Sequence, residues 1–455
     1  LVGKGVVFDT GYGTCIAEDG NGVERYNLWG LTEKRGKIER QNLLVFINSE
    51  LSNGVETFTE IGYYTSDSER RNHPSYAFTS SKHRVGPDNY WLNQMTTPDG
   101  TAIFAGQELY IDNYRYAEVP RMTFVDKETY RFLQGFRGTT GNWDWETALV
   151  YSKATSDDLT KNRISNTLLK EALYDDTPAA YNPFSAGVAS NIERVLVDVT
   201  RFGTSSLTSF DFKMVNPEMF TLPAGPVAVL LGFEVRDEVI TDNRDDRLDG
   251  TIDYCDYEND CYPLVADVLN SSPTGDVSGK RQTTSLFVEL NAPITDSIST
   301  QLAVRHESSD DFASATVGKF AIGWEVNPSL SLRASASTAF RAPNIIQLNE
   351  GGVVRSGSND DWVVQRVQDV LNEAGGYDGD TSITDSDIDS YYTIQRRAIG
   401  GNKLDAEEST NSSIGLVYTP EMVPGLMVTL DQWSIEKEKT IGLFGRENQI
   451  VNDML

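Results

Sequence analysis

The chain has 455 residues and a formal net charge of −28, with 39 Lys and Arg against 67 Asp and Glu. This acidic balance argues against a nucleic-acid partner, because binding to phosphate needs a basic surface. The longest apolar run, VAVLLGF at 227–233, is far below the roughly 18 to 20 residues that a membrane-spanning helix requires.

The short apolar runs do not exclude a membrane β-barrel, because the strands of a barrel need only about 9 to 11 residues with every second one apolar. The aromatic content of 10%, with 20 Tyr and 19 Phe, fits such a barrel and also fits a soluble β-sandwich.

The chain begins LVGKGVVF, without Met or a positively charged, apolar leader. We therefore expect a mature product or an internal fragment without a targeting segment.

Segments with a two-residue alternation predict about twelve strands in six pairs. In chain order the pairs are 41–48 with 56–64, 130–137 with 143–152, 209–215 with 227–240, 281–291 with 299–307, 316–326 with 330–340, and 407–419 with 426–436. The stretch VAVLLGFEVR illustrates the pattern: Val229, Leu231 and Phe233 share one face, and Glu234 and Arg236 lie on the other. One face of each strand is apolar and the other is polar.

The connections favour a barrel over a sandwich. Within the pairs they are short and turn-like, whereas most connections between pairs are long, about 40 to 65 residues, which is far beyond the loops of an ordinary compact domain. Outer-membrane barrels combine short periplasmic turns with long extracellular loops and aromatic girdles. Aromatic residues lie near the strand ends as such girdles require: Trp143, Tyr151, Phe210, Phe212, Trp324 and Trp433.

The long connections are acidic and contain a candidate disulfide. Cys255 and Cys261 lie in the polar stretch DYCDYENDCYP, a spacing that suits a small disulfide loop in an oxidising compartment, while Cys15 is left over.

Asp385, Asp387 and Asp389 suggest a calcium loop, but Ser390 replaces the glycine of an EF-hand. We favour a solvated acidic surface, which divalent cations would bridge to lipopolysaccharide.

The sequence contains no recognisable catalytic constellation. It has only three histidines, and no HExxH, GxSxG, phosphate loop or CxxC. His73 and His83 lie ten residues apart in a polar connection, so we interpret them as bystanders and not as metal ligands. We expect no enzyme, no metal and no cofactor.

Two blocks of the sequence are similar to segments of a known protein family. In SLSLRASASTAFRAPNIIQL, a strand ends in Phe340-Arg341-Ala342-Pro343. This block resembles the lumen-lining strand of TonB-dependent outer-membrane receptors, which ends in a Phe-Arg-Ala-Pro turn. Pro343 has no backbone N–H, so a central strand must end there. The second block, LDAEESTNSSIGLVYTPEMVPGLMVTLDQWSIE at 404–436, is similar to a paired-strand segment of the same family, and SLFVELNAPI, AVRHESSDDF and YNPFSAG resemble further barrel pieces.

The resemblance implies an all-β fold, a transmembrane antiparallel barrel of about 22 strands filled by an N-terminal plug. It also implies a location in the outer membrane of a Gram-negative bacterium and contact with lipid and lipopolysaccharide. We recognise no plug and no TonB box, and therefore expect the middle of a larger receptor. We predict an extracellular loop region at 1–40 that leads into a partial barrel at 41–455.

The function implied by the resemblance is active import. A scarce nutrient is bound outside, and TonB, powered by ExbB and ExbD, opens the plug; a surface lipoprotein is a further expected partner. A passive porin and an adhesion barrel remain the alternatives. Anionic iron-siderophores are usually bound by Arg and Lys in the pocket. The acidic loops therefore favour a neutral or cationic cargo such as oligosaccharide or peptide.

Several loop aromatics are candidate ligand contacts, because their rings stack on sugars; the alternative is that they only pack the loops together. These residues are Tyr90, Trp91, Tyr114, Tyr116, Trp362, Tyr391 and Tyr392. Arg341 has the same two interpretations, a structural pair with acidic loop or plug residues or a contact with the cargo.

Overall fold

The structure, a computed structural model, describes residues 30–442 except 53, 78–80, 98, 105, 112–113, 186, 351–352, 361–390 and 399–403. It also describes the backbone alone of residues 7–9 and 15–17, and of the strands at 353–360 and 391–398. None of the helices in these parts of the chain has the length and apolar character needed to cross a membrane.

Twelve antiparallel strands form one continuous sheet, and their order along the sheet is β20-β19-β16-β15-β14-β13-β12-β11-β10-β9-β4-β3. The strands are β3 (Lys37–Glu50), β4 (Glu56–Asn72), β9 (Arg121–Thr140), β10 (Trp143–Ile164), β11 (Leu196–Leu222), β12 (Gly225–Arg244), β13 (Val277–Thr295), β14 (Ile298–Ser309), β15 (Ala315–Asn327), β16 (Leu330–Arg341), β19 (Glu407–Tyr418) and β20 (Val428–Glu438). All twelve predicted strands are confirmed.

The remaining elements are short and lie in the connections. They are β1 (Val7–Asp9), β2 (Cys15–Ala17), β5 (Tyr76–Ala77), β6 (Arg84–Val85), α1 (Tyr90–Asn93), β7 (Leu109–Tyr110), β8 (Tyr114–Arg115), α2 (Asn166–Leu173), the 3-10 helix η3 (Ile192–Arg194), α3 (Asp246–Asp249), α4 (Ile345–Asn349), β17 (Val353–Asp360) and β18 (Tyr391–Ala398). The predicted division at residue 40 stays a prediction; strand β3 begins at Lys37.

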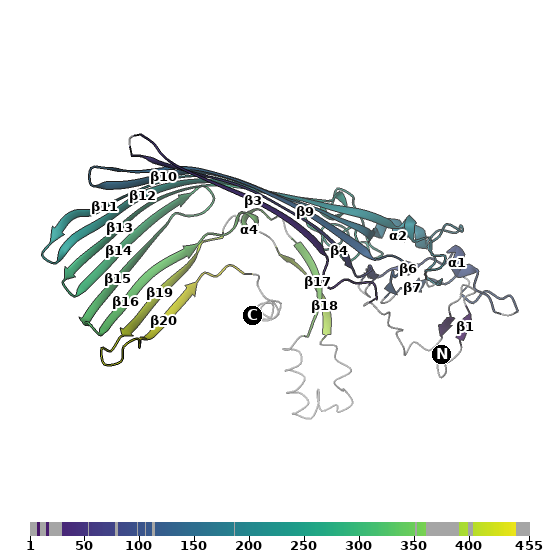
Figure 1. Ribbon diagram of the computed structural model, residues 1–455. Helices are drawn as coiled ribbons and strands as arrows, with labels where there is room; N and C mark the ends of the chain where they lie inside the picture. The colour runs from purple at the N-terminus through teal and green to yellow at the C-terminus, as the bar shows by residue number, and fades with distance from the viewer. Residues whose placement is uncertain are drawn as a thin grey trace, which may run out of the picture.

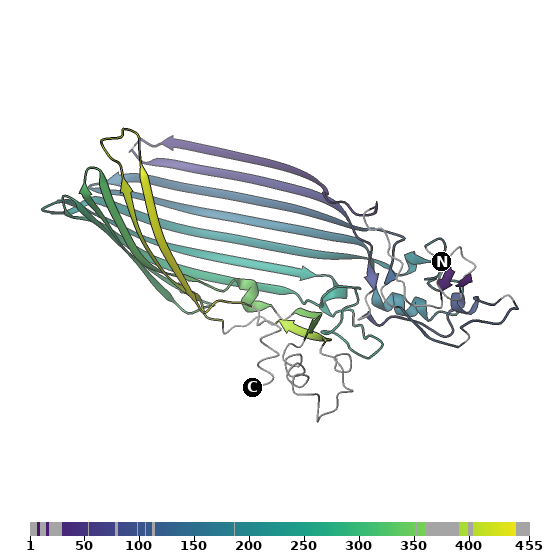
Figure 2. The ribbon, with the colours of Figure 1, turned by 90° about the horizontal axis from the view of Figure 1, so that it is seen from below.

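The sheet curls into a trough, as Figures 1 and 2 show. The tight turns of the strand pairs lie at one end of the trough, and the long connections gather at the other. Among the described residues, β3 and β20 are the two edges, so the sheet is not closed into a barrel there.

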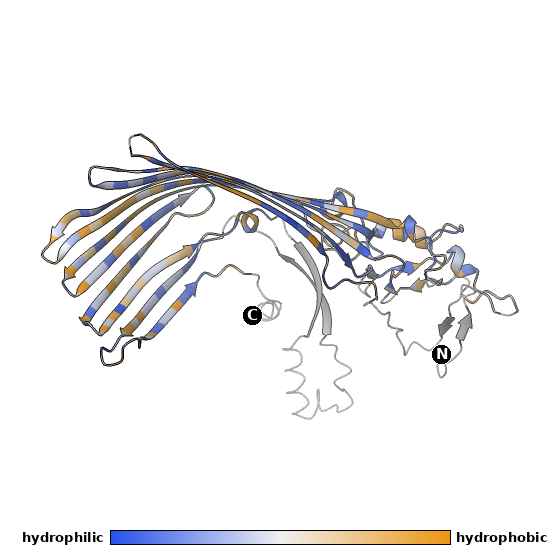
Figure 3. Ribbon diagram, viewed as in Figure 1, coloured by the Kyte–Doolittle hydropathy of each residue, from blue (hydrophilic) through white to orange (hydrophobic). Residues whose placement is uncertain are grey.

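The convex face of the sheet is apolar. Leu231, Val288 and Val304 lie directly opposite one another on β12, β13 and β14, and their exposed fractions are 40%, 37% and 48%. Gly279 belongs to the other face of β13 and lies against Ile345 of helix α4, which Figure 1 places on the concave side. Figure 3 shows the resulting alternation of polar and apolar residues along the strands. Such a broad exposed apolar face needs an apolar covering, as lipid supplies.

Strands β9 to β12 are longer than predicted. On the convex face of β10, Trp145, Leu149 and Tyr151 are followed by Lys153 and Asp157, so the apolar band ends near Tyr151. The predicted strand ended there too, because it was defined by apolar alternation, but the hydrogen-bonded ladder of β10 with β9 continues to residue 161. The long connections are correspondingly shorter than predicted: 73–120, 165–195 and 245–276.

A row of carboxylates crosses the sheet beyond the apolar band. Glu39 of β3 lies directly opposite Asp67 of β4, Asp67 lies opposite Asp126 of β9, and Asp126 lies opposite Asp157 of β10. Like charges directly opposite each other on neighbouring strands repel and destabilise the pairing. Only Glu39, at the end of this row, has a cation beside it, since Lys37 Nζ lies 2.6 Å from its carboxylate among the ion pairs of the described residues.

We predict that Asp126→Asn stabilises the sheet, because Asp126 has a carboxylate opposite it on both sides. The gain in the free energy of unfolding should be about 0.5 kcal/mol, measured by urea unfolding of the detergent-solubilised protein. Asp237→Asn is the matched control, because Asp237 is opposite Thr208 and Gln282 and should leave the midpoint unchanged. An equal gain in both variants would point to net charge instead of the row.

The three connections 73–120, 165–195 and 245–276 pack together over the end of the sheet, and we call them the loop unit. Each contributes to one hydrophobic core, with Leu92 from the first, Leu169 and Leu173 of helix α2 from the second, and Leu269 from the third. Ser165 caps α2 by accepting from Leu168 N. The long connections therefore have a core of their own.

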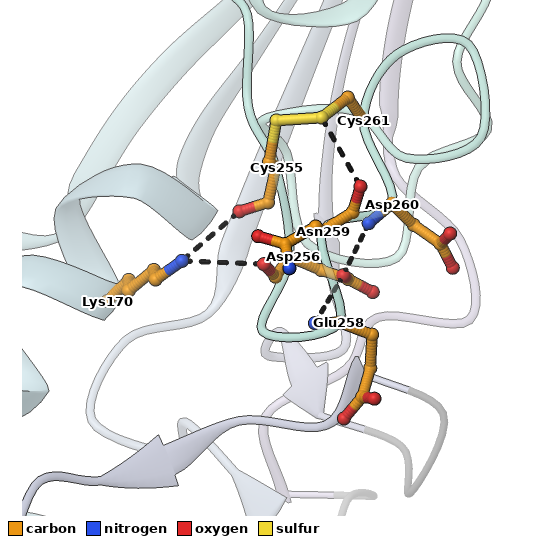
Figure 4. Close-up of a disulfide and its surroundings, with 7 residues drawn as sticks. All are labelled: Lys170, Cys255, Asp256, Glu258, Asn259, Asp260 and Cys261. Carbon is orange, nitrogen blue, oxygen red and sulfur yellow. Dashed lines mark hydrogen bonds between the residues drawn. A yellow bond between two sulfur atoms is a disulfide. The ribbon is translucent and has the colours of Figure 1, made fainter.

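Buried polar contacts tie the second and third connections to each other, and a disulfide closes a small loop within the third. Asp267 is 0% exposed; it accepts from Thr167 N at 2.7 Å and pairs with Arg247. A disulfide joins Cys255 and Cys261. Figure 4 shows it beside helix α2, where Lys170 Nζ donates to the carbonyls of Cys255 and Asp256 at 3.3 and 3.4 Å.

Candidate functional site

The concave face carries charged residues that three strands bring together. Glu234 of β12 lies directly opposite Ser285 of β13, and Ser285 lies directly opposite Glu307 of β14. Arg236 and Arg305 are each two residues from one of these carboxylates, so strand alternation returns all four charged side chains to the same face. We call Glu234, Arg236, Ser285, Arg305 and Glu307 the inner-face charge cluster.

The cluster is closed and electrically balanced. Arg305 Nη2 lies 3.0 Å from Glu234 Oε2 and 3.1 Å from Glu307 Oε2, and Arg236 Nη2 lies 3.4 Å from Glu307 Oε1. Ser285 Oγ donates to Glu307 at 3.0 Å and accepts from Arg305 at 2.8 Å. Glu307 is the most buried of the charged members, 7% exposed. Two carboxylates and two guanidinium groups thus neutralise one another on the concave face.

A shallow groove of about 580 Å³ follows on the same face toward the short turns. Its floor is built mostly from small side chains: Ala228, Ser299, Ala321, Gly323, Ser335 and Ser413. Arg333 borders it and forms a bidentate pair with Asp431 of β20, with Nη2 to Oδ2 at 2.6 Å. Small and polar side chains along a concave wall leave room for another segment or a solute.

The Phe-Arg-Ala-Pro turn lies at the rim where strand β16 ends. Arg341, the last residue of the strand, donates through Nε and Nη2 to both oxygens of Glu407, each at 2.7 Å, and Glu407 lies directly opposite on β19. The ring of Phe340 lies 6.1 Å from that of Phe312. The partner of Arg341 is therefore a residue of the neighbouring strand.

Pro343 turns the chain toward the concave side. It is buried, and its carbonyl accepts from Arg281 Nη2 at 2.7 Å, while Arg281 Nε also pairs with Asp311 at 2.6 Å. Asn344 then caps helix α4 in a capping box with Gln347. The segment after the turn thus closes over the inner face instead of running away from the wall.

The structure places four of the predicted aromatic ligand contacts in the loop unit. Tyr116 is 1% exposed and packs in the core, with its ring 5.0 Å from that of Tyr114. The Tyr114 hydroxyl lies 3.1 Å from that of Tyr181. Trp91 Nε1 donates to the carbonyl of Ala180 at 2.9 Å, and the Tyr90 ring lies edge-on at 4.8 Å from the Trp91 ring. Trp91, Tyr114 and Tyr116, whose ring lies 5.7 Å from that of Tyr181, join the first connection to the second, whereas the Tyr90 ring contacts its own neighbour.

The other predicted contacts cannot be located in the same way. Trp362 lies outside the described residues, and for Tyr391 and Tyr392 only the backbone of strand β18 is described. Asp385, Asp387 and Asp389, considered for calcium, also lie outside the described residues.

His83 is buried in the loop unit. It is 1% exposed, its ring lies edge-on at 5.9 Å from that of Tyr257, and neither ring nitrogen is in hydrogen-bond geometry. Burial lowers the pKa of His83 to about 4, although nearby Asn166 and Asp256 act in the opposite direction. His83 is therefore neutral at pH 7.

We predict that the loop unit loses stability as the pH falls from about 6.5 to about 4. The unfolded chain binds a proton at His83 below its ordinary pKa, near 6.5, and the folded unit does so only below about 4. Unfolding thus takes up a proton in this window, which lowers the free energy of unfolding by at most about 3 kcal/mol. Proteolysis of the loop unit at pH 7 and pH 5 measures this change. His83→Phe should flatten the pH dependence, whereas His73→Phe should retain it; equal curves for His83→Phe and the unmodified protein would contradict it.

The chain matches the model of a protein family described as "TonB dependent receptor-like, beta-barrel" over residues 57–452. No curated protein matches it.

Among solved structures, the chain is similar to the siderophore receptor PirA from Acinetobacter baumannii, with 14% identity over 89% of this chain and 44% of that one and a TM-score of 0.49. A mutant of the ferric enterobactin receptor PfeA from Pseudomonas aeruginosa has 15% identity over 90% and 44%, with a TM-score of 0.49. The RagAB peptide importer has 11% identity over 84% and 38%, with a TM-score of 0.45. The chain thus spans less than half the length of these proteins.

Proposed function

The chain belongs to the TonB-dependent receptor family, and from this premise we propose that it forms part of the wall of an outer-membrane importer. The importer binds a scarce nutrient at the cell surface and takes it across the outer membrane with energy from TonB, ExbB and ExbD. This coupling runs through a plug that the parent receptor supplies.

The observation that supports this proposal is the opposite chemistry of the two faces of the sheet. The convex face exposes apolar rows such as Leu231, Val288 and Val304, which suits contact with lipid. The concave face carries the inner-face charge cluster and the groove beside Arg333. A neutralised polar wall suits a lumen that holds a plug and passes a polar solute.

We propose a neutral or cationic cargo, with oligosaccharide and peptide ahead of iron-siderophore. The net charge of −28 favours this order, because an acidic surface repels anionic complexes. Tyr90, Trp91 and Tyr114 keep some exposed surface and remain proposed ligand contacts, as do Trp362, Tyr391 and Tyr392. Tyr116 is buried beneath these residues and would hold the Tyr114 ring in place through their ring contact. A surface lipoprotein and lipopolysaccharide are proposed as further partners.

Uptake by the full-length parent receptor tests the proposal. Cells that express it should accumulate one of three labelled probes, an oligosaccharide, a peptide or a ferric siderophore, and deletion of TonB should abolish this accumulation. Uptake that survives the deletion would reject active import and favour a passive porin. Induction of the parent gene during growth on polysaccharide, and not under iron limitation, would separate the cargo classes.

A further inference from the structure

The connection between β19 and β20 differs from the other turns at its end of the sheet. The pairs β9–β10, β11–β12, β13–β14 and β15–β16 are joined by two residues each, 141–142, 223–224, 296–297 and 328–329, and the pair β3–β4 is joined by residues 51–55. The β19–β20 connection spans residues 419–427, with the sequence TPEMVPGLM. We call it the long turn.

The long turn presents apolar side chains to its surroundings. Met422 is 92% exposed, the largest exposed fraction of any large hydrophobic residue in the described chain, and Met427 is 66%, Val423 50% and Leu426 41% exposed. Isolated exposed apolar residues are ordinary, but a contiguous group of them marks a contact surface.

Backbone hydrogen bonds fix the shape of the long turn. Thr419 N donates to the carbonyl of Ser329 at 2.8 Å, which ties the turn to the neighbouring hairpin. Val423 N donates to Pro420 O at 3.2 Å and Leu426 N to Val423 O at 3.1 Å. Gly425 adopts a φ of +85°, which favours glycine. The exposure of Met422 is therefore a consequence of a formed turn.

The long turn continues the apolar convex face. Trp324, Leu332 and Leu416 occupy one register row of that face, and Leu330 and Tyr418 occupy the next row toward the turn. Val428 lies directly opposite Tyr418, and these two are 45% and 44% exposed. Trp and Tyr are typical of the level at which a barrel leaves the hydrocarbon layer, so the next residues along the chain reach the headgroup region.

We propose that the long turn inserts Met422, Val423 and Met427 into the periplasmic leaflet of the outer membrane and anchors this edge of the wall. The partner is a lipid surface and not an anionic headgroup site, because the only charged residue of the turn is Glu421. Insertion removes apolar area from water, which favours the bound position. The inference rests on the membrane location of the proposed function and is independent of the cargo.

Spin labelling tests the anchor in the full-length parent receptor, reconstituted in phosphatidylethanolamine and phosphatidylglycerol bilayers. Labels are placed on Met422→Cys, on Leu302→Cys in the middle of the convex face, and on Asp296→Cys in a short turn, each in a Cys15→Ser background. The measurement is the accessibility of each label to oxygen, which concentrates in lipid, and to a water-soluble nickel complex.

The ratio of oxygen to nickel accessibility at residue 422 should be several-fold above that at residue 296 and below that at residue 302, as expected for a position at the depth of the headgroup boundary. A ratio at 422 equal to that at 296 overturns the anchor, and so does a label at 422 shielded from both reagents, which would mean coverage by protein. A water-like ratio at 302 would instead contradict the membrane location, so the two failures are distinguishable. Met422→Asp adds a negative charge to the turn, so we expect the turn to leave the lipid. The oxygen accessibility of a label on Val423→Cys should therefore fall in this variant.

Discussion

Replacing Leu173 with alanine is expected to unfold the loop unit while the twelve-stranded sheet stays folded. The Leu173 side chain is 0% exposed in the core shared by three connections, and its carbonyl accepts from Gly86 N and Asn89 Nδ2, each at 3.0 Å. Truncating a buried leucine to alanine costs about 2 to 5 kcal/mol. A core of this size has little stability beyond that amount.

Limited proteolysis in detergent measures the effect, because an unfolded loop unit exposes 73–120 and 165–195 to cleavage. The sheet should keep its strand signal in circular dichroism, since its ladder does not depend on the loop core. Leu264→Ala is the matched control, because Leu264 belongs to the same unit but is 39% exposed, and it should be cleaved as slowly as the unmodified protein. Loss of the strand signal in Leu173→Ala would show that the sheet and the loop unit unfold together.

The strands could be predicted because a wall between lipid and a polar lumen imposes an alternation that is visible in one strand at a time. The strand ends could not, because beyond Tyr151 both faces are in water and Lys153 and Asp157 replace the apolar residues, although the hydrogen bonds continue. The predicted end after Phe340 was close, because Pro343 stops the ladder through its own backbone chemistry and Arg341 is the last strand residue.

The inner-face charge cluster was not predicted, and the reason is sequence distance. Arg305 and Glu234 are 71 positions apart, so nothing local connects them; only the register of three strands does. The polar face of each strand was visible, and a charged residue on such a face was the one available signal. The loop unit was not predicted for a related reason. Leu92, Leu173 and Leu269 lie in segments without periodicity, and their shared core forms only after the sheet brings the connections together.

Replacing Glu307 with glutamine is expected to destabilise the sheet by about 2 kcal/mol or more. Glu307 accepts from Ser285 and pairs with both Arg236 and Arg305. The substitution preserves shape but leaves two guanidinium groups with Glu234 alone. Removing one partner from a mostly buried, hydrogen-bonded charge group costs about 2 kcal/mol or more. The urea midpoint of the detergent-solubilised protein should fall accordingly.

Glu289→Gln is the matched control for the loss of a carboxylate on the same face. Its partners are the amides of Gln301 and Asn291, with Nε2 at 2.5 Å and Nδ2 at 3.2 Å from Glu289 Oε1. A glutamine oxygen accepts such bonds equally well, so the midpoint should hardly move. The double variant Glu307→Gln with Arg236→Gln separates charge from shape. If the balance of charges stabilises the wall, removing one of the two guanidinium groups that share Glu234 recovers part of the loss, and the coupling between the two sites is positive. Losses that simply add would mean that Glu307 and Arg236 act independently, and the concave face would then tolerate an uncompensated charge, as a water-filled lumen does.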